Sequence, residues 1–136
     1  MRPLLLDTNA YTAFMLGAAE VVEVVAHAER LFVNSIVLGE LLAGFAAGTR
    51  EPRSRAELAR FLDSPRVEVL PVTGQTADSY ALVYAGLRRK GKPIPTNDLW
   101  IAASALEHGA ALLTRDTHFS QIDGLRCGQR LDDFLP

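Results

Sequence analysis

Residues 4–9 of the chain, Leu-Leu-Leu-Asp-Thr-Asn, place three apolar residues in an unbroken run and end it with three polar ones. An unbroken apolar run of this kind is typical of a strand that is buried on both faces, as the strands of parallel sheets are. Residues 111–116, Ala-Leu-Leu-Thr-Arg-Asp, show the same pattern near the other end of the chain. The two stretches predict two buried strands with an aspartate just beyond each, Asp7 and Asp116.

Predicted strands and helices alternate along the rest of the sequence. The strands are expected at residues 3–6, 31–33, 67–70 and 111–114, with a short edge strand at 125–128. The helices are expected at residues 10–30, 36–47, 52–63, 77–90 and 98–108, with a last turn at 131–135. Gly17 could interrupt the first helix, and Ser35 is the expected N-cap of the second.

This alternation predicts the fold class. Strands that alternate with helices form a parallel sheet with helices on both faces. We therefore expect an α/β fold, a three-layer α/β/α sandwich around a short, mainly parallel central sheet of four to five strands. The length of 136 residues fits a single domain that spans residues 1–136.

The composition argues against several classes of protein. Hydrophobic residues make up 49% of the chain and charged residues 22%, as in an ordinary globular protein. No apolar run approaches the ~20 residues of a membrane-spanning helix, and Asp7 ends the first run too early for a secretion signal. Cys127 is the only cysteine, which excludes an intramolecular disulfide and argues against a thiolate zinc site. We expect a cytoplasmic protein without a membrane partner.

The net charge of −2 provides no overall attraction for a nucleic acid. Basic residues nevertheless gather in two stretches, at residues 50–60 and 88–92. Solvated helix faces, and the preference of helix C-termini for cations, explain these stretches equally well. The candidates for contact with a nucleic acid such as RNA or with another polyanion are Arg50, Arg53, Arg88, Arg89, Lys90 and Lys92.

Glu40 lies in the middle of an otherwise apolar helix, Ile-Val-Leu-Gly-Glu-Leu-Leu-Ala-Gly-Phe at residues 36–45. The residues one and two turns away, among them Ile36, Ala43 and Gly44, form an apolar stripe of mostly small side chains. A carboxylate buried on such a stripe needs a partner or a metal ion, because an unpaired buried charge is costly. The alternative is that Glu40 lies at the exposed edge of the helix.

Asp98 falls in the first turn of a predicted helix that Thr96 and Asn97 introduce. The helix dipole favours an aspartate there without any further role. The residues that follow, Leu-Trp-Ile-Ala-Ala at 99–103, are apolar, so the helix is expected to belong to the core and to carry one carboxylate at its N-terminal end.

Four carboxylates can thus meet at one place: Asp7, Glu40, Asp98 and Asp116. Parallel strands end at the same edge of a sheet, and ligands of such sheets bind beyond that edge. Carboxylates without histidine or cysteine ligands form a hard-oxygen site that suits Mg²⁺ or Mn²⁺. The chemistry served by such clusters is usually phosphodiester hydrolysis.

The ordered set of motifs resembles the PIN-domain nucleases, and specifically the VapC-like toxins of bacterial type II toxin–antitoxin systems. Its parts are Leu-Leu-Leu-Asp-Thr-Asn at 4–9, the mid-helix Glu40, Asn-Asp at 97–98 and Leu-Leu-Thr-Arg-Asp at 112–116. The resemblance covers essentially the whole chain. It implies a three-layer α/β/α fold, Mg²⁺- or Mn²⁺-dependent endoribonuclease activity, a homodimer, and a cognate antitoxin that blocks the site.

By this resemblance the four acidic residues match the family's catalytic quartet, and Thr8, Asn9 and Thr114 match the polar positions around it. Those three would hold water or a carboxylate in place. Two other functions compete with this one. A phosphatase or phosphotransfer domain would need a second aspartate two residues after Asp7 or a lysine at a late strand end, and Asn9 and the segment 114–116 supply neither. A non-catalytic PIN-scaffold binding module would be expected to lack part of the quartet. His118 is expected to be a partly exposed loop residue.

Overall fold

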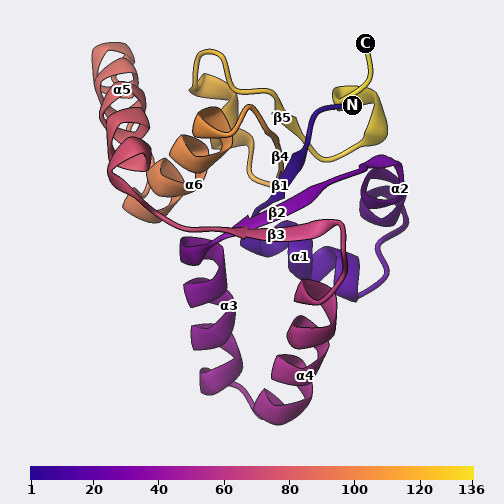
Figure 1. Ribbon diagram of the computed structural model, residues 1–136. Coiled ribbons are helices and arrows are strands. Elements are labelled where there is room, and N and C mark those ends of the chain that lie inside the picture. Colours follow the sequence, from indigo (N-terminus) through magenta and orange to yellow (C-terminus); the bar gives the residue numbers. More distant parts are fainter.

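The computed structural model describes residues 1–136 and contains one five-stranded sheet (Figure 1). All strand pairs are parallel, and the strand order is β3-β2-β1-β4-β5. The strands are β1 (Leu4–Leu6), β2 (Leu31–Asn34), β3 (Val67–Leu70), β4 (Ala111–Leu113) and β5 (Cys127–Gly128). The predicted fold class, an α/β fold around a short parallel sheet, is confirmed.

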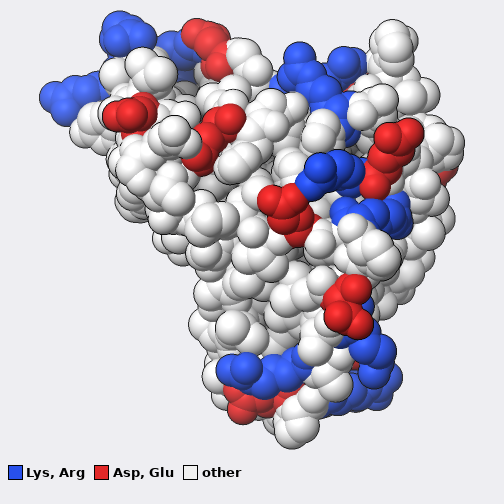
Figure 2. All heavy atoms as spheres, in the orientation of Figure 1, with Lys and Arg blue, Asp and Glu red and all other residues white.

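Six α-helices and two short 3-10 helices connect the strands. The α-helices are α1 (Thr8–Met15), α2 (Ala19–His27), α3 (Ser35–Ala47), α4 (Glu51–Leu62), α5 (Gly74–Lys90) and α6 (Thr96–Glu107). The 3-10 helices are η1 (Thr117–Gln121) and η2 (Leu131–Asp133). In Figure 1, α5 and α6 pack together on one side of the sheet, and α3 and α4 form a hairpin that projects from it. Figure 2 shows charged side chains of both signs gathered at the far end of this hairpin.

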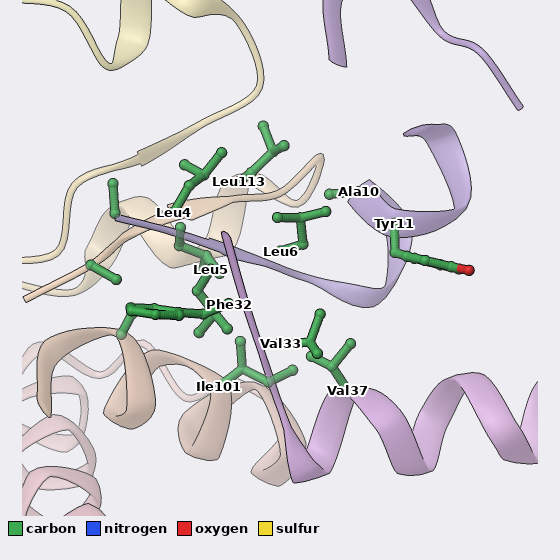
Figure 3. Packing of buried hydrophobic residues seen from close by; sticks show 14 of the residues in the cluster. Leu4, Leu5, Leu6, Ala10, Tyr11, Phe32, Val33, Val37, Ile101 and Leu113 are labelled. Carbon is green, nitrogen blue, oxygen red and sulfur yellow. The ribbon is translucent and has the colours of Figure 1, made fainter. Parts of the chain in front are cut away.

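The core lies on both faces of β1. Leu4, Leu5 and Leu6 are fully buried, as the unbroken apolar run predicts. Figure 3 shows Leu5 on the side of the sheet that faces Ile101 of α6, whereas Leu4 points to the opposite side. Because side chains alternate along a strand, three consecutive leucines bury apolar surface against both outer layers.

The register of the central strands brings two polar residues side by side at the sheet edge. Leu6 pairs with Leu113 across β1 and β4, and the Asp7 backbone N–H donates to the Leu113 carbonyl at 2.9 Å. Asp7 and Thr114 therefore leave the ends of adjacent strands together. This edge is where the predicted ligand position lies for a parallel sheet.

The helix expected at residues 10–30 is interrupted at Gly17, the expected position of a break: it forms two helices, α1 and α2, and Gly17 between them adopts a left-handed backbone conformation with φ of 78°. Two other local expectations differ from the structure. The helix expected to begin at Asp98 begins two residues earlier, at Thr96, and the edge strand expected at 125–128 is confined to Cys127–Gly128.

No single helix is long and apolar enough to cross a membrane. The helices α1 and α2 have that length and apolarity only when they are taken together, and the chain bends by 105° between them.

The N-cap of α3 is also not the expected one. Asn34, and not Ser35, caps the helix, because the Asn34 Oδ1 atom accepts a hydrogen bond from the Val37 N–H at 2.9 Å. Asn34 is fully buried at the end of β2, and its Nδ2 atom donates to Ser104 Oγ of α6 at 2.9 Å. Ser35 is exposed as the first helical residue. Both residue types are good N-caps, so burial of the strand end decides between them.

Candidate active site

Asp7 lies at the junction of β1 and α1, where only 3% of the residue is exposed. As the N-cap of α1, its Oδ1 atom accepts from the Thr8 N–H at 2.8 Å. Its Oδ2 atom accepts from the Thr114 hydroxyl at 2.7 Å and from Asn9 Nδ2 at 3.3 Å. Both oxygens of this carboxylate are therefore held in place, by the first turn of α1 and by the residue that follows β4.

The charge of Asp7 is costly in this position. Burial raises the pKa of Asp7 from 3.8 to about 6, the hydrogen bonds from Thr114 and Thr8 oppose this rise, and the nearby charges of Asp98 and Asp116 add to it. A carboxylate that is buried among other carboxylates favours its protonated form unless a cation is present.

Glu40 reaches the same place from the middle of α3. Its Oε1 atom accepts from the Thr8 hydroxyl at 2.6 Å, and its Oε2 atom accepts from Asn97 Nδ2 at 3.2 Å. The residue is half-buried. Both oxygens are thus oriented by residues of other elements, Thr8 from α1 and Asn97 from α6.

Asp98 occupies the first turn of α6, and 15% of its side chain is exposed. Its Oδ2 atom lies 2.8 Å from Nε2 of His118. Burial raises the pKa of Asp98, the His118 imidazole opposes this, and the charges of Glu40 and Asp116 add to the rise. Asp98 therefore shares the electrostatic environment of Asp7.

Asp116 is the most exposed of the four acidic residues. Its Oδ2 atom accepts from Asn9 Nδ2 at 3.2 Å, so the amide of Asn9 bridges Asp7 and Asp116. The Asp116 N–H donates to the Thr114 hydroxyl at 3.1 Å, and Asn9 Oδ1 accepts from the Arg115 N–H at 3.0 Å. Thr114 and Asn9 thus tie the β4 end to the β1 end.

The four carboxylates surround one open hollow of about 490 Å³. The residues that line it come from the end of β1, from α1 and its C-cap, from α3 and α6, and from the segment after β4: Asp7, Thr8, Asn9, Thr12, Ala13, Leu16, Glu40, Asp98, Arg115 and Asp116. Arg115 lies at 3.7 Å from Glu20 and is partly neutralised there. The donor set consists mainly of carboxylate oxygens, which fits a hard divalent cation.

The expected site residues are therefore brought together, and two further residues join them. Asn97 orients Glu40, and His118 contacts Asp98 from η1. His118 is partly exposed, as expected, but it lies in the 3-10 helix η1 and not in a loop, and its Nε2 atom is shielded inside the site. The only signals in the sequence are that Asn97 precedes Asp98 and that His118 follows Asp116 by two residues.

The basic candidates fall into two separate regions. Arg50 and Arg53 line a second hollow of about 280 Å³, which shares Thr12 and Leu16 with the acidic one. The four candidates at the end of α5 and beyond line neither hollow: Arg88, Arg89, Lys90 and Lys92. Lys90 is bound to Asp123 at 2.6 Å and to the Gln121 carbonyl at 2.7 Å. Only Arg50 and Arg53 therefore line a hollow that adjoins the acidic one.

Comparison with known proteins gives one consistent family. The model of the PIN domain matches residues 4–125. Ribonuclease VapC1 of Haemophilus influenzae is 32% identical over 127 residues, which cover 90% of this chain and 93% of that protein. Ribonuclease VapC4 of Mycobacterium tuberculosis is 32% identical over 88 residues, or 65% of this chain and 68% of that protein. The solved structure of DNA-bound VapBC from Salmonella typhimurium has a TM-score of 0.82 at 29% identity and covers 95% of this chain and 98% of that chain.

Proposed function

The chain belongs to the PIN domain family, and on that premise we propose that it is a metal-dependent endoribonuclease, the toxin of a type II toxin–antitoxin pair. Its relatives carry the name ribonuclease VapC, and its structural neighbours are VapBC complexes. The chain has all four carboxylates, and all four line the hollow. A non-catalytic binding module has no need of this complete set.

The convergence of four carboxylates in one open hollow carries the proposal. Their charges repel one another, and burial raises the pKa of both Asp7 and Asp98. A divalent cation held among them offsets both costs. We assign Mg²⁺ or Mn²⁺ to Asp7, Glu40, Asp98 and Asp116, since carboxylate oxygens are the ligands these ions prefer. When bound, such an ion activates water and neutralises charge on the scissile phosphate.

The surrounding hydrogen bonds give the four acidic residues different roles. Asp7 and Glu40 are fixed on both oxygens, so they are preorganised to receive a cation without rearrangement. Asp116 is exposed and is held through one side-chain hydrogen bond from Asn9. We therefore infer that Asp116 contributes least to binding of the ion. Thr8, Asn9 and Thr114 act as positioning residues.

The hollow lined by Arg50 and Arg53 suggests where the RNA strand binds next to the acidic hollow. Arg50 and Arg53 lie where the acidic hollow continues past Thr12 and Leu16. Guanidinium groups bind phosphates through bidentate hydrogen bonds, so an RNA strand with its scissile phosphate among the carboxylates would find cationic contacts there. The structural neighbours are toxin–antitoxin complexes, and we extend that assembly to this chain: a homodimer in the cytoplasm, inhibited by a cognate antitoxin.

The experiment that tests this function is RNA cleavage by the purified protein. We expect cleavage with Mg²⁺ or Mn²⁺, none in excess chelator, and a loss of at least ~100-fold in rate for Asp7→Asn, Glu40→Gln and Asp98→Asn. These substitutions keep side-chain volume and remove charge, and Asp116→Asn is expected to cost less. Asp78→Asn, an exposed position on α5, is the matched control and should cleave normally. Undiminished cleavage in chelator would contradict the mechanism.

A further inference from the structure

His118 places a ring nitrogen inside the acidic site. Its side chain is 35% exposed, but its Nε2 atom is shielded from solvent and makes no hydrogen bond. Nε2 lies 2.8 Å from Asp98 Oδ2, but this contact does not have the geometry of a hydrogen bond. A buried polar atom without a hydrogen bond is destabilising and is rare in folded proteins.

The core holds the ring in this position. His118 belongs to η1, and its ring packs on that of Phe119 with centroids 4.7 Å apart and planes at 43°. Phe119 is fully buried, so it anchors the 3-10 helix to the core. The imidazole is therefore placed by packing and not by a hydrogen bond of its own nitrogen.

The atoms around Nε2 are spaced for a shared cation. One ligand atom from each of Asp98, Asp116 and His118 lies within 4.8 Å of the other two. Ligand atoms of one octahedral ion, each ~2.1 Å from it, lie about 3 Å apart when adjacent and about 4 Å apart when opposite. A small contraction of the three side chains is enough to reach that spacing.

We propose that His118 Nε2 is a ligand of the divalent ion, so that the centre is a mixed nitrogen–oxygen site that favours Mn²⁺ over Mg²⁺. The proposal deepens the proposed function and rests on it. Mg²⁺ prefers oxygen ligands and retains its water, whereas transition-metal ions gain more from an imidazole nitrogen. A ligand role also explains why Nε2 is buried without a hydrogen bond.

The competing explanation is that His118 is only a counter-ion for Asp98. A counter-ion would leave the bound metal with oxygen ligands alone. The two explanations therefore differ in which atoms touch the ion, and a spectroscopic measurement separates them without any reference to activity.

The measurement is pulsed EPR of Mn²⁺ bound to the wild-type protein. Electron spin echo modulation from a directly coordinated ¹⁴N nucleus is expected in the wild type and is expected to vanish in His118→Gln. His108→Gln is the matched control and should retain it. His108 ends α6, about 15 Å along the helix from Asp98 at ~1.5 Å per residue. The wild-type spectrum decides the question even if His118→Gln fails to fold.

Calorimetric titration supplies the second readout. We expect His118→Gln to lower Mn²⁺ affinity about 10-fold and Mg²⁺ affinity by less than about 2-fold. Bound Mn²⁺ without nitrogen modulation would overturn the ligand role of His118 and leave the carboxylate centre intact. Failure of the wild type to bind Mn²⁺, or equal binding after Asp98→Asn, would overturn the proposed metal centre together with it.

Discussion

At the residue scale, the negative charge of Asp7 destabilises the folded chain when no cation is bound. Burial raises its pKa from 3.8 to about 6, so the folded chain binds a proton at this site more tightly than the unfolded chain does. The contribution of Asp7 to stability is therefore fully present below pH ~4 and is lost as the pH rises through about 6. Binding of a divalent cation would reverse this dependence, because it stabilises the ionised form.

We predict that Asp7→Asn stabilises the metal-free protein above pH 6 while it abolishes cleavage. A shift of about two pKa units corresponds to at most ~3 kcal/mol, so we expect a gain of about 1–3 kcal/mol in the free energy of unfolding. Urea denaturation in EDTA at pH 8 measures this gain, and the difference between the two proteins should shrink at pH 4. An Asp7→Asn protein that is less stable than the wild type at pH 8 would contradict the cost assigned to the charge.

At the scale of elements, α3 and α6 each deliver one carboxylate, and Asn34 links the N-terminus of α3 to the C-terminal half of α6. It caps α3 through Val37 and donates to Ser104 of α6. We predict that Asn34→Ala lowers the free energy of unfolding by about 2 kcal/mol, because α3 loses its cap and the buried Ser104 loses a hydrogen bond.

Ser35→Ala is the matched control for this prediction, since Ser35 is the neighbouring capping type but is exposed. It should change stability by less than ~0.5 kcal/mol in urea denaturation. Equal losses in the two variants would mean that the capping assignment is wrong.

At the scale of the whole molecule, a chain of net charge −2 must attract RNA by the local arrangement of its charges. Arg50 and Arg53 adjoin the acidic hollow, whereas Arg88 lies away from it and donates to the Tyr84 hydroxyl at 3.2 Å. We predict that the pair Arg50→Gln and Arg53→Gln weakens binding of a labelled single-stranded oligoribonucleotide. The slope of the logarithm of the binding constant against the logarithm of the salt concentration should become shallower by about 0.7 for each phosphate contact that is lost.

Fluorescence anisotropy in the inactive Asp98→Asn background, with Mg²⁺ present, measures this binding across a series of salt concentrations. The pair Arg88→Gln and Arg89→Gln serves as the comparison and should have the smaller effect. A larger effect of the Arg88→Gln and Arg89→Gln pair would mean that the RNA binds near the end of α5 and not near Arg50 and Arg53.

The sequence alone determines those features that depend on neighbouring residues. The apolar runs at 4–6 and 111–113 are strands buried on both faces because their residues are continuously hydrophobic. A site aspartate follows each run, Asp7 directly and Asp116 after Thr114 and Arg115. Because parallel strands end at one edge, the meeting of Asp7 with Asp116 also follows from the pattern.

The tertiary structure decides what depends on residues far apart in the chain. The choice of Asn34 over Ser35 as a cap follows from burial of the β2 end against Ser104, 70 residues away. The Asn97 contact with Glu40 spans 57 residues, and Lys90 is occupied by Asp123, 33 residues further on. The position of His118 Nε2, shielded and 2.8 Å from Asp98 Oδ2, likewise depends on how η1 and α6 are placed relative to each other. Local periodicity carries no information on such contacts, since they depend on how whole elements pack against one another.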